Sequence, residues 1–123
     1  MSGSVIAQCS ARRLDDVDLS CRVADIGDDT VVSLSGELDL ASVPALRNAL
    51  VRAIDDRRGA TVLVDLDGVS ALDDTGLGIL LGAAGRARDA GGDLVLVTTS
   101  ARMRDRFDST GLSRAIEVRD RMS

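Results

Sequence analysis

The chain has 123 residues, which is enough for one domain with a sizeable core and too few for two. Its formal net charge of −5 argues against a nucleic-acid partner, because nucleic acids bind to basic surfaces. The sequence contains neither histidine nor lysine, which excludes imidazole catalysis, lysine Schiff bases and a P-loop lysine.

No segment approaches the ~20 consecutive apolar residues that a membrane-spanning helix needs, and the N-terminal residues lack the pattern of a signal peptide. We therefore expect a cytoplasmic protein with no membrane partner. The only cysteines are Cys9 and Cys21, and their spacing matches no metal-binding or redox motif. We expect free thiols here, with a disulfide under oxidising conditions as the alternative.

Residues 1–18 are small, polar and charged, which predicts a flexible leader with room for a short edge strand near its end. Two apolar segments follow, Ser20–Ile26 and Val31–Ser35, and the sequence Gly27-Asp28-Asp29 between them favours a turn. We expect an antiparallel hairpin here, after which residues 36–40 lead out of the sheet.

Helical spacing of apolar residues begins after Ser42, a plausible N-cap, and Pro44 falls in the first turn, where its missing N–H is not needed. The helix should end at Gly59, after Arg57 and Arg58, whose charges suit the negative end of a helix.

A continuous apolar run at residues 61–66 predicts a strand covered on both faces, and Asp67-Gly68 predicts a turn after it. A second helix should run from about Thr75 to Asp89. The residues of its predicted core stripe are Leu77, Leu80, Leu81, Ala84 and Ala87.

Three glycines, Gly78, Gly82 and Gly85, fall together on another face of this helix. Each costs about 1 kcal/mol relative to alanine in a helix interior, so something must offset them. Two interpretations remain open: close packing on the domain's own sheet, or a bare face that a partner's backbone can approach. A dinucleotide site is excluded, because the glycines lie within the helix and not in the loop before it.

The C-terminal third predicts a strand at residues 94–98, a helix that starts at Ser100 and ends at Gly111, and a last strand at residues 115–118. Met103 and Phe107 are expected in the core. A hairpin followed by alternating helices and strands predicts an α/β domain with right-handed crossovers.

Two clusters of acidic residues invite a chemical interpretation. The segment 62–68 superficially resembles the first motif of haloacid-dehalogenase-type phosphatases, with Asp65 as nucleophile, but a buried strand that ends in an acidic turn explains it more simply. Asp65, Asp67, Asp73 and Asp74 alternate across strand and turn, so only two or three of them could converge on a metal ion. Asp73, Asp74 and Thr75 lie at the start of the second helix, where a carboxylate caps free N–H groups.

Three segments resemble the anti-sigma factor antagonists of bacteria, which consist of a STAS domain: Gly36-Glu37-Leu38-Asp39, Val62–Leu66 and Leu72-Asp73-x-Thr75-Gly76-Leu77-Gly78. The resemblance covers about residues 20–118. It implies a STAS-like single α/β domain at residues 19–123, with a mixed four- to five-stranded sheet, an N-terminal β-hairpin and about three helices packed on it. It also implies a protein that is not an enzyme and uses no cofactor or metal.

In that family the antagonist binds an anti-sigma factor that is also a serine kinase, which frees the sigma factor. The kinase phosphorylates a hydroxyl residue directly after the first Asp of the motif, the complex dissociates, and a phosphatase resets the switch. A phosphate adds about −1.5 to −2 charge at the helix start that the partner contacts. The resemblance assigns partner binding to Glu37, Asp39, Asp73, Asp74, Thr75, Gly76, Leu77 and Gly78.

This chain departs from the family at the position of the phosphate acceptor, which is Asp74 instead of serine. Three outcomes are open: Asp74 imitates the unmodified serine and leaves binding permanently on, it imitates phosphoserine and leaves binding off, or Thr75 is the acceptor. We favour the first, because a carboxylate carries one charge on a short side chain and imitates phosphate poorly. A soluble STAS subunit of a membrane transport or lipid-trafficking complex is the alternative function, and a small phosphatase using Asp65 is a third.

Overall fold

The computed structural model describes residues 5–12, 18–38 and 42–120, with side chains described from Ser20 onwards. Within these residues one six-stranded sheet has its strands in chain order, β1-β2-β3-β4-β5-β6. The first two pairings are antiparallel and the other three are parallel. The strands are β1 (Val5–Arg12), β2 (Asp18–Ile26), β3 (Asp29–Leu38), β4 (Thr61–Leu72), β5 (Asp93–Val97) and β6 (Glu117–Arg119).

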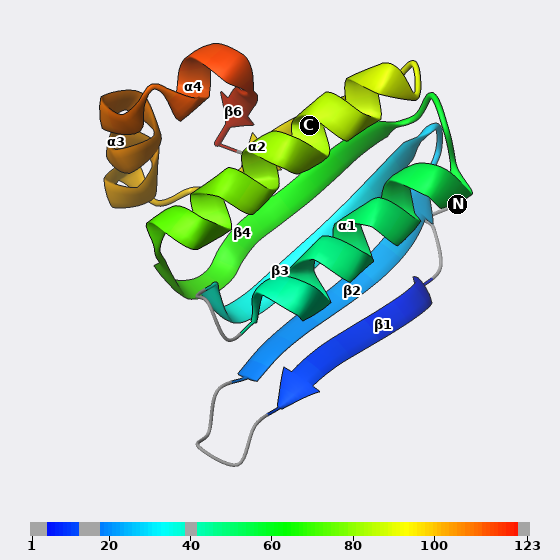
Figure 1. The fold of residues 1–123 in the computed structure, drawn as a ribbon, viewed down its shortest axis with the longest axis horizontal. Helices are drawn as coiled ribbons and strands as arrows, with labels where there is room; N and C mark the ends of the chain where they lie inside the picture. The colour runs from blue at the N-terminus through cyan, green and yellow to red at the C-terminus, as the bar shows by residue number, and fades with distance from the viewer. Residues whose placement is uncertain (1–4, 13–17, 39–41, 121–123) are drawn as a thin grey trace.

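Helices connect the parallel strands, as parallel pairing requires. Two long helices, α1 (Val43–Asp56) and α2 (Asp74–Asp89), lie side by side on the same face of the sheet (Figure 1). The shorter α3 (Ala101–Thr110) and α4 (Leu112–Ala115) lie beyond α2, at the end of the sheet opposite β1 (Figure 1). No helix within the described ranges is long and apolar enough to cross a membrane.

The core lies between the sheet and the two long helices. Alternate residues of a strand point to opposite faces, so β4 sends Val62, Val64 and Leu66 into the main core. Leu63 joins a smaller buried cluster with Val31, Val95 and Val97. The predicted strand covered on both faces is therefore confirmed for residues 62–64 and 66, while Thr61 and Asp65 are half-buried. Phe107 is fully buried and Met103 packs against the core, also as expected.

The predicted α/β class and the N-terminal hairpin are confirmed, since β2 and β3 pair across Ile26 and Asp29. The sheet has six strands instead of four or five, because Val5–Arg12 pair with β2 inside the segment that we expected to be a leader. The described residues also form four helices instead of about three, because the short α4 follows Gly111 directly. Gly111 ends α3 with a φ of +82°, as its predicted role at the helix end requires.

The predicted turn at Asp67-Gly68 is wrong, because β4 continues through it to Leu72. The β3–β4 register shifts between Ser33 and Ser35, which marks a β-bulge. A Cβ at Gly68 would lie 2.8 Å from the carbonyl oxygen of Leu34, so the close approach of β3 requires glycine there.

The ends of α1 use different contacts from those that we predicted. Ser42 occupies the N-cap position but makes no side-chain cap bond to the helix; its hydroxyl donates to the carbonyl of Glu37 at 2.8 Å. At the other end, Arg57 donates to the carbonyls of Asp29 and Gly27, at 2.9 and 3.1 Å, and thereby ties α1 to the β2–β3 turn.

Cys21 is disulfide-bonded, which corrects the expectation of a free thiol. Its side chain is 2% exposed. The backbone register of β1 and β2 sets position 9, the chain's other cysteine, directly opposite Cys21. The spacing of the two residues along the chain did not reveal this pairing, because an edge strand was expected only near the end of the leader and not at residues 5–12.

Candidate functional site

The site lies where β4 ends and α2 begins. Asp73 is the N-cap of α2, and its carboxylate accepts a hydrogen bond from the backbone N–H of Gly76 at 3.0 Å. The N–H of Asp73 donates to the carbonyl of Leu38 at 3.0 Å, so the start of α2 is attached to the end of β3. The predicted capping by an acidic residue is confirmed, and the junction is held in place from two sides.

Asp74 is the first residue of α2 and points away from the fold, with 95% of its side chain exposed. Its carboxylate lies 3.3 Å from the Nη2 atom of Arg106, which comes from α3. A negative group also suits this position because the free N–H groups of the first turn are partly positive. Position 74, which the sequence resemblance predicts to correspond to a phosphate acceptor, is therefore occupied by an exposed carboxylate that is paired with a cation of the same chain.

The neighbours of Asp74 at the surface are also polar. Thr75 and Glu37 are exposed. The β3–β4 register sets Glu37 opposite Ala71, so Glu37 lies at the same end of the sheet as the start of α2. Asp39, the other predicted acid of this surface, lies outside the described residues. We name the exposed residues Glu37, Asp73, Asp74, Thr75 and Gly78 the acidic junction.

Two of the predicted partner-binding residues lie inside the fold. Leu77 is 7% exposed and belongs to the main core. A Cβ at Gly76 would lie 2.7 Å from the Cδ1 atom of Leu72 and 3.1 Å from the Cβ of Leu38, so this glycine allows α2 to pack closely on the strand ends. Gly76 and Leu77 position the acidic junction and are not part of its surface.

The other glycines of α2 differ from Gly76. Gly78, Gly82 and Gly85 are exposed, and a Cβ at any of them would meet no atom within 4 Å. Close packing on the domain's own sheet, one of the two interpretations that the sequence left open, is therefore wrong for these three. Each of these glycines costs about 1 kcal/mol in helix propensity relative to alanine, and no packing contact among the described residues offsets that cost.

The predicted core stripe of α2 is confirmed at four positions and wrong at Leu81. Leu81 is 45% exposed, while Ala83 is buried and takes part in the core. The solvent-facing side of α2 thus combines exposed glycines with an exposed leucine, which is an unusual composition for a surface helix.

Asp65 and Asp67, the candidates for phosphatase or metal chemistry, have structural roles. The Oδ1 atom of Asp65 accepts a hydrogen bond from the N–H of Asp67 at 3.0 Å. The Oδ1 atom of Asp67 accepts from the N–H and the hydroxyl of Thr99, at 2.7 and 3.1 Å, which fixes the loop between β5 and α3. No group of three or more acidic or cysteine side chains within the described ranges is arranged to hold a metal ion.

An ion pair joins the two long helices. Asp55 of α1 accepts from the Nη2 and Nε atoms of Arg86 of α2, at 2.9 and 3.3 Å. The hydrogen bonds from Arg86 hold the pKa of the Asp55 carboxyl below its ordinary value, with smaller coulombic contributions from Arg86 and Arg58 and an opposing effect of burial. The same contact raises the pKa of Arg86.

Sequence reasoning missed Arg106, which is 32 residues from Asp74 along the chain. No local pattern marks it, because three arginines alternate along the start of α3 and only the packing of α3 shows which one reaches α2. A groove between α1 and α2 was missed for the same reason, since its residues come from two separate helices.

These features define a small α/β domain. Its distinctive surface is the exposed start of α2, which is hydrogen-bonded to the end of β3. The STAS domain family model matches residues 21–123. An anti-sigma-B factor antagonist of Bacillus subtilis is 38% identical over 90 residues, which cover 73% of this chain and 81% of that protein. A relative with the same description from Listeria monocytogenes is 35% identical over 72% of this chain and 77% of its own length.

A solved structure supports the same assignment. The crystal structure of an anti-sigma factor antagonist from Mycobacterium paratuberculosis superposes with a TM-score of 0.76 at 26% identity, over 91% of this chain and 92% of that one. The chain therefore belongs to the STAS-domain family of anti-sigma factor antagonists, and its relatives are named as regulators.

Proposed function

We propose that this protein binds an anti-sigma factor of the serine-kinase type and thereby releases a sigma factor for transcription. The observation that carries the proposal is the acidic junction: a helix start with exposed Asp74 and Thr75, held rigidly by Asp73. A fixed, exposed surface loses little conformational entropy when a partner docks. The names of the relatives supply the class of partner.

The proposed partner surface consists of Glu37, Asp73, Asp74, Thr75 and Gly78, and Asp39 extends it on sequence grounds. In this role the protein acts by occupying a surface, in the cytoplasm, without catalysing a reaction. The alternative of a transport-complex subunit has no specific observation in its favour.

Asp74 leaves the protein in its binding-competent form in this proposal. A phosphoserine would bring about −1.5 to −2 charges and three acceptor oxygens to the start of α2. Asp74 brings a single negative charge, and Arg106 lies close enough to offset part of it. Asp74 thus carries less negative charge than a phosphoserine would, and it lacks the bulk and the third acceptor oxygen of a phosphate.

Regulation by phosphate at position 74 is then absent, and a phosphatase has no substrate at this residue. Thr75 is the remaining hydroxyl of the acidic junction. We propose that it stays unmodified, since the position that the family phosphorylates directly follows Asp73 and is Asp74.

The experiment uses the purified protein and the serine-kinase anti-sigma factors of its source organism. Binding is measured by titration calorimetry without ATP and again after incubation with ATP, and phosphate is mapped by mass spectrometry. The proposal predicts binding to one of these kinases that ATP does not abolish, with no phosphate on the chain. Stoichiometric phosphothreonine at Thr75 would contradict the proposed regulation, and failure to bind any of them would contradict the function.

A further inference from the structure

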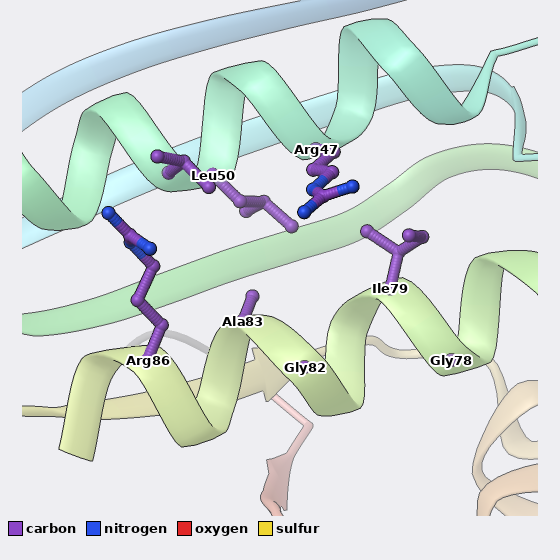
Figure 2. A pocket seen from close by; sticks show the side chains of 8 residues that line it. Arg47, Leu50, Gly78, Ile79, Gly82, Ala83 and Arg86 are labelled. Atoms are coloured by element: carbon purple, nitrogen blue, oxygen red, sulfur yellow. The ribbon is translucent and has the colours of Figure 1, made fainter. Parts of the chain in front are cut away.

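A groove of about 250 Å³ separates α1 from α2 on the outer side of the domain. Figure 2 shows that Arg47 and Leu50 of α1 point towards α2, while Ile79, Ala83 and Arg86 of α2 point towards α1. The groove is thus formed by side chains of both long helices.

The floor of the groove is apolar. Leu50 and Ala83 are buried and form its base, and Val51 and Ile79 are half-buried at its sides. Such a floor accepts apolar side chains, because their burial releases water from both surfaces.

The α2 side of the groove is bare. Gly78 and Gly82 line it, and a Cβ at either position would meet no atom within 4 Å outside the local backbone of α2. The backbone of α2 is therefore open to a partner's backbone at two successive turns of the helix. Packing within the domain does not explain why side chains are missing there.

The two ends of the groove each carry an arginine, and only one of the two is paired with a carboxylate. Arg86 is already engaged by Asp55, at 2.9 and 3.3 Å. Arg47 is exposed, and among the described residues it has no acidic partner. An occupant with apolar side chains and one carboxylate would match the floor and the unpaired guanidinium together.

The groove is continuous with the acidic junction. Gly78 belongs to both, and it lies one helical turn after Asp74 on the same helix. A single partner that contacts the start of α2 can therefore reach into the groove without a change in the fold.

We propose that the groove between α1 and α2 is a second contact for the anti-sigma factor, filled by an amphipathic helix that places an acidic side chain against Arg47. This inference rests on the proposed function. The apolar face of the partner helix packs on Leu50, Ile79 and Ala83, and Gly82 permits close approach of the two helices.

The test compares two groove variants with two matched controls in binding to the purified anti-sigma factor. Gly82→Leu fills the groove and Arg47→Glu reverses its free charge. The controls are Gly85→Leu and Arg52→Glu, exposed positions on the same two helices that do not line the groove. Thermal unfolding of each variant verifies the fold, and both leucine variants should melt at or above the wild-type temperature because leucine favours helix over glycine.

The inference predicts that each groove variant weakens binding by about tenfold or more, while each control stays within about twofold of wild type. Equal binding by wild type and all four variants would overturn the groove contact and leave the proposed function intact. A wild-type protein that binds no anti-sigma factor would overturn both. A concentration-dependent dimer that Gly82→Leu abolishes would assign the groove to a second copy of this chain and contradict the inference.

Discussion

The carboxylate of Asp74 and the guanidinium of Arg106 lie 3.3 Å apart, so α3 supplies a cation to the first residue of α2. Asp74 is 95% exposed, and a pair this exposed contributes little to folding stability. The effect of this ion pair is electrostatic, because the charge that a partner meets at the start of α2 depends on α3 as well as on α2.

Replacing Asp74 with serine should create the phosphorylation switch that we propose is missing at this position. Unmodified Asp74→Ser should bind the anti-sigma factor about as well as wild type, because both side chains are small and Arg106 offsets part of the single charge of Asp74. After incubation with the kinase and ATP the variant should carry one phosphate and bind at least about tenfold more weakly. Titration calorimetry with and without ATP measures this, and the wild-type protein treated in the same way serves as the control.

Replacing Arg106 with glutamine should weaken partner binding by exposing the full charge of Asp74. We expect a loss of about three- to tenfold, larger at low salt than at high salt because the effect is coulombic. Arg102→Gln is the matched control, since Arg102 lines the same side of α3 without pairing with Asp74. The double variant with Asp74→Ser should recover wild-type affinity; if it binds as weakly as Arg106→Gln alone, Arg106 acts by another route.

Two glycine-to-alanine changes in α2 should shift stability in opposite directions. Gly76→Ala places a methyl group 2.7 Å from Leu72 and should lower the free energy of unfolding by about 1–3 kcal/mol. Gly85→Ala meets no neighbouring atom within 4 Å and should raise it by about 0.5–1 kcal/mol. Urea unfolding at pH 7 measures both, and a loss of stability in Gly85→Ala would contradict its free position on the helix.

The pair between Asp55 and Arg86 predicts a dependence of stability on pH. Because folding lowers the pKa of Asp55, its contribution is complete above the ordinary value of 3.8 and is lost as the pH falls through the folded-state pKa. Asp55→Asn should therefore be slightly less stable than wild type at pH 7. The difference between the two proteins should shrink towards zero below that pKa, as measured by urea midpoints at a series of pH values. A difference that persists unchanged in acid would point to a contribution other than charge.

Local signals predicted the elements that lie around the site. Three of these features can be recognised from a few neighbouring residues: the apolar run of β4, the cap at Ser100 and the left-handed Gly111. The hydroxyl of Ser100 accepts a hydrogen bond from the N–H of Met103 at 3.2 Å. Asp73 was recognisable as a helix cap for the same reason, because its hydrogen-bond partner is three residues away.

The remaining features depend on contacts between distant segments. Leu81 and Ala83 both fit a helical period, and only the placement of α1 beside α2 decides that Ala83 is covered and Leu81 is not. Gly68 has the composition of a turn but lies in a β-bulge, because β3 approaches it closely. Arg106 pairs with Asp74 of α2, and Arg47 lines a groove beside α2. Neither contact can be predicted from spacing along the chain, because each joins segments that are distant in sequence.

The central claim is that this protein displaces a sigma factor by occupying its anti-sigma factor. The most direct measurement adds the purified protein to a preformed complex of sigma factor and anti-sigma factor, in the presence of ATP, and follows free sigma factor by size-exclusion chromatography. The account predicts stoichiometric release of sigma factor that persists throughout incubation with ATP. A complex that stays intact at saturating concentrations of the protein would contradict it.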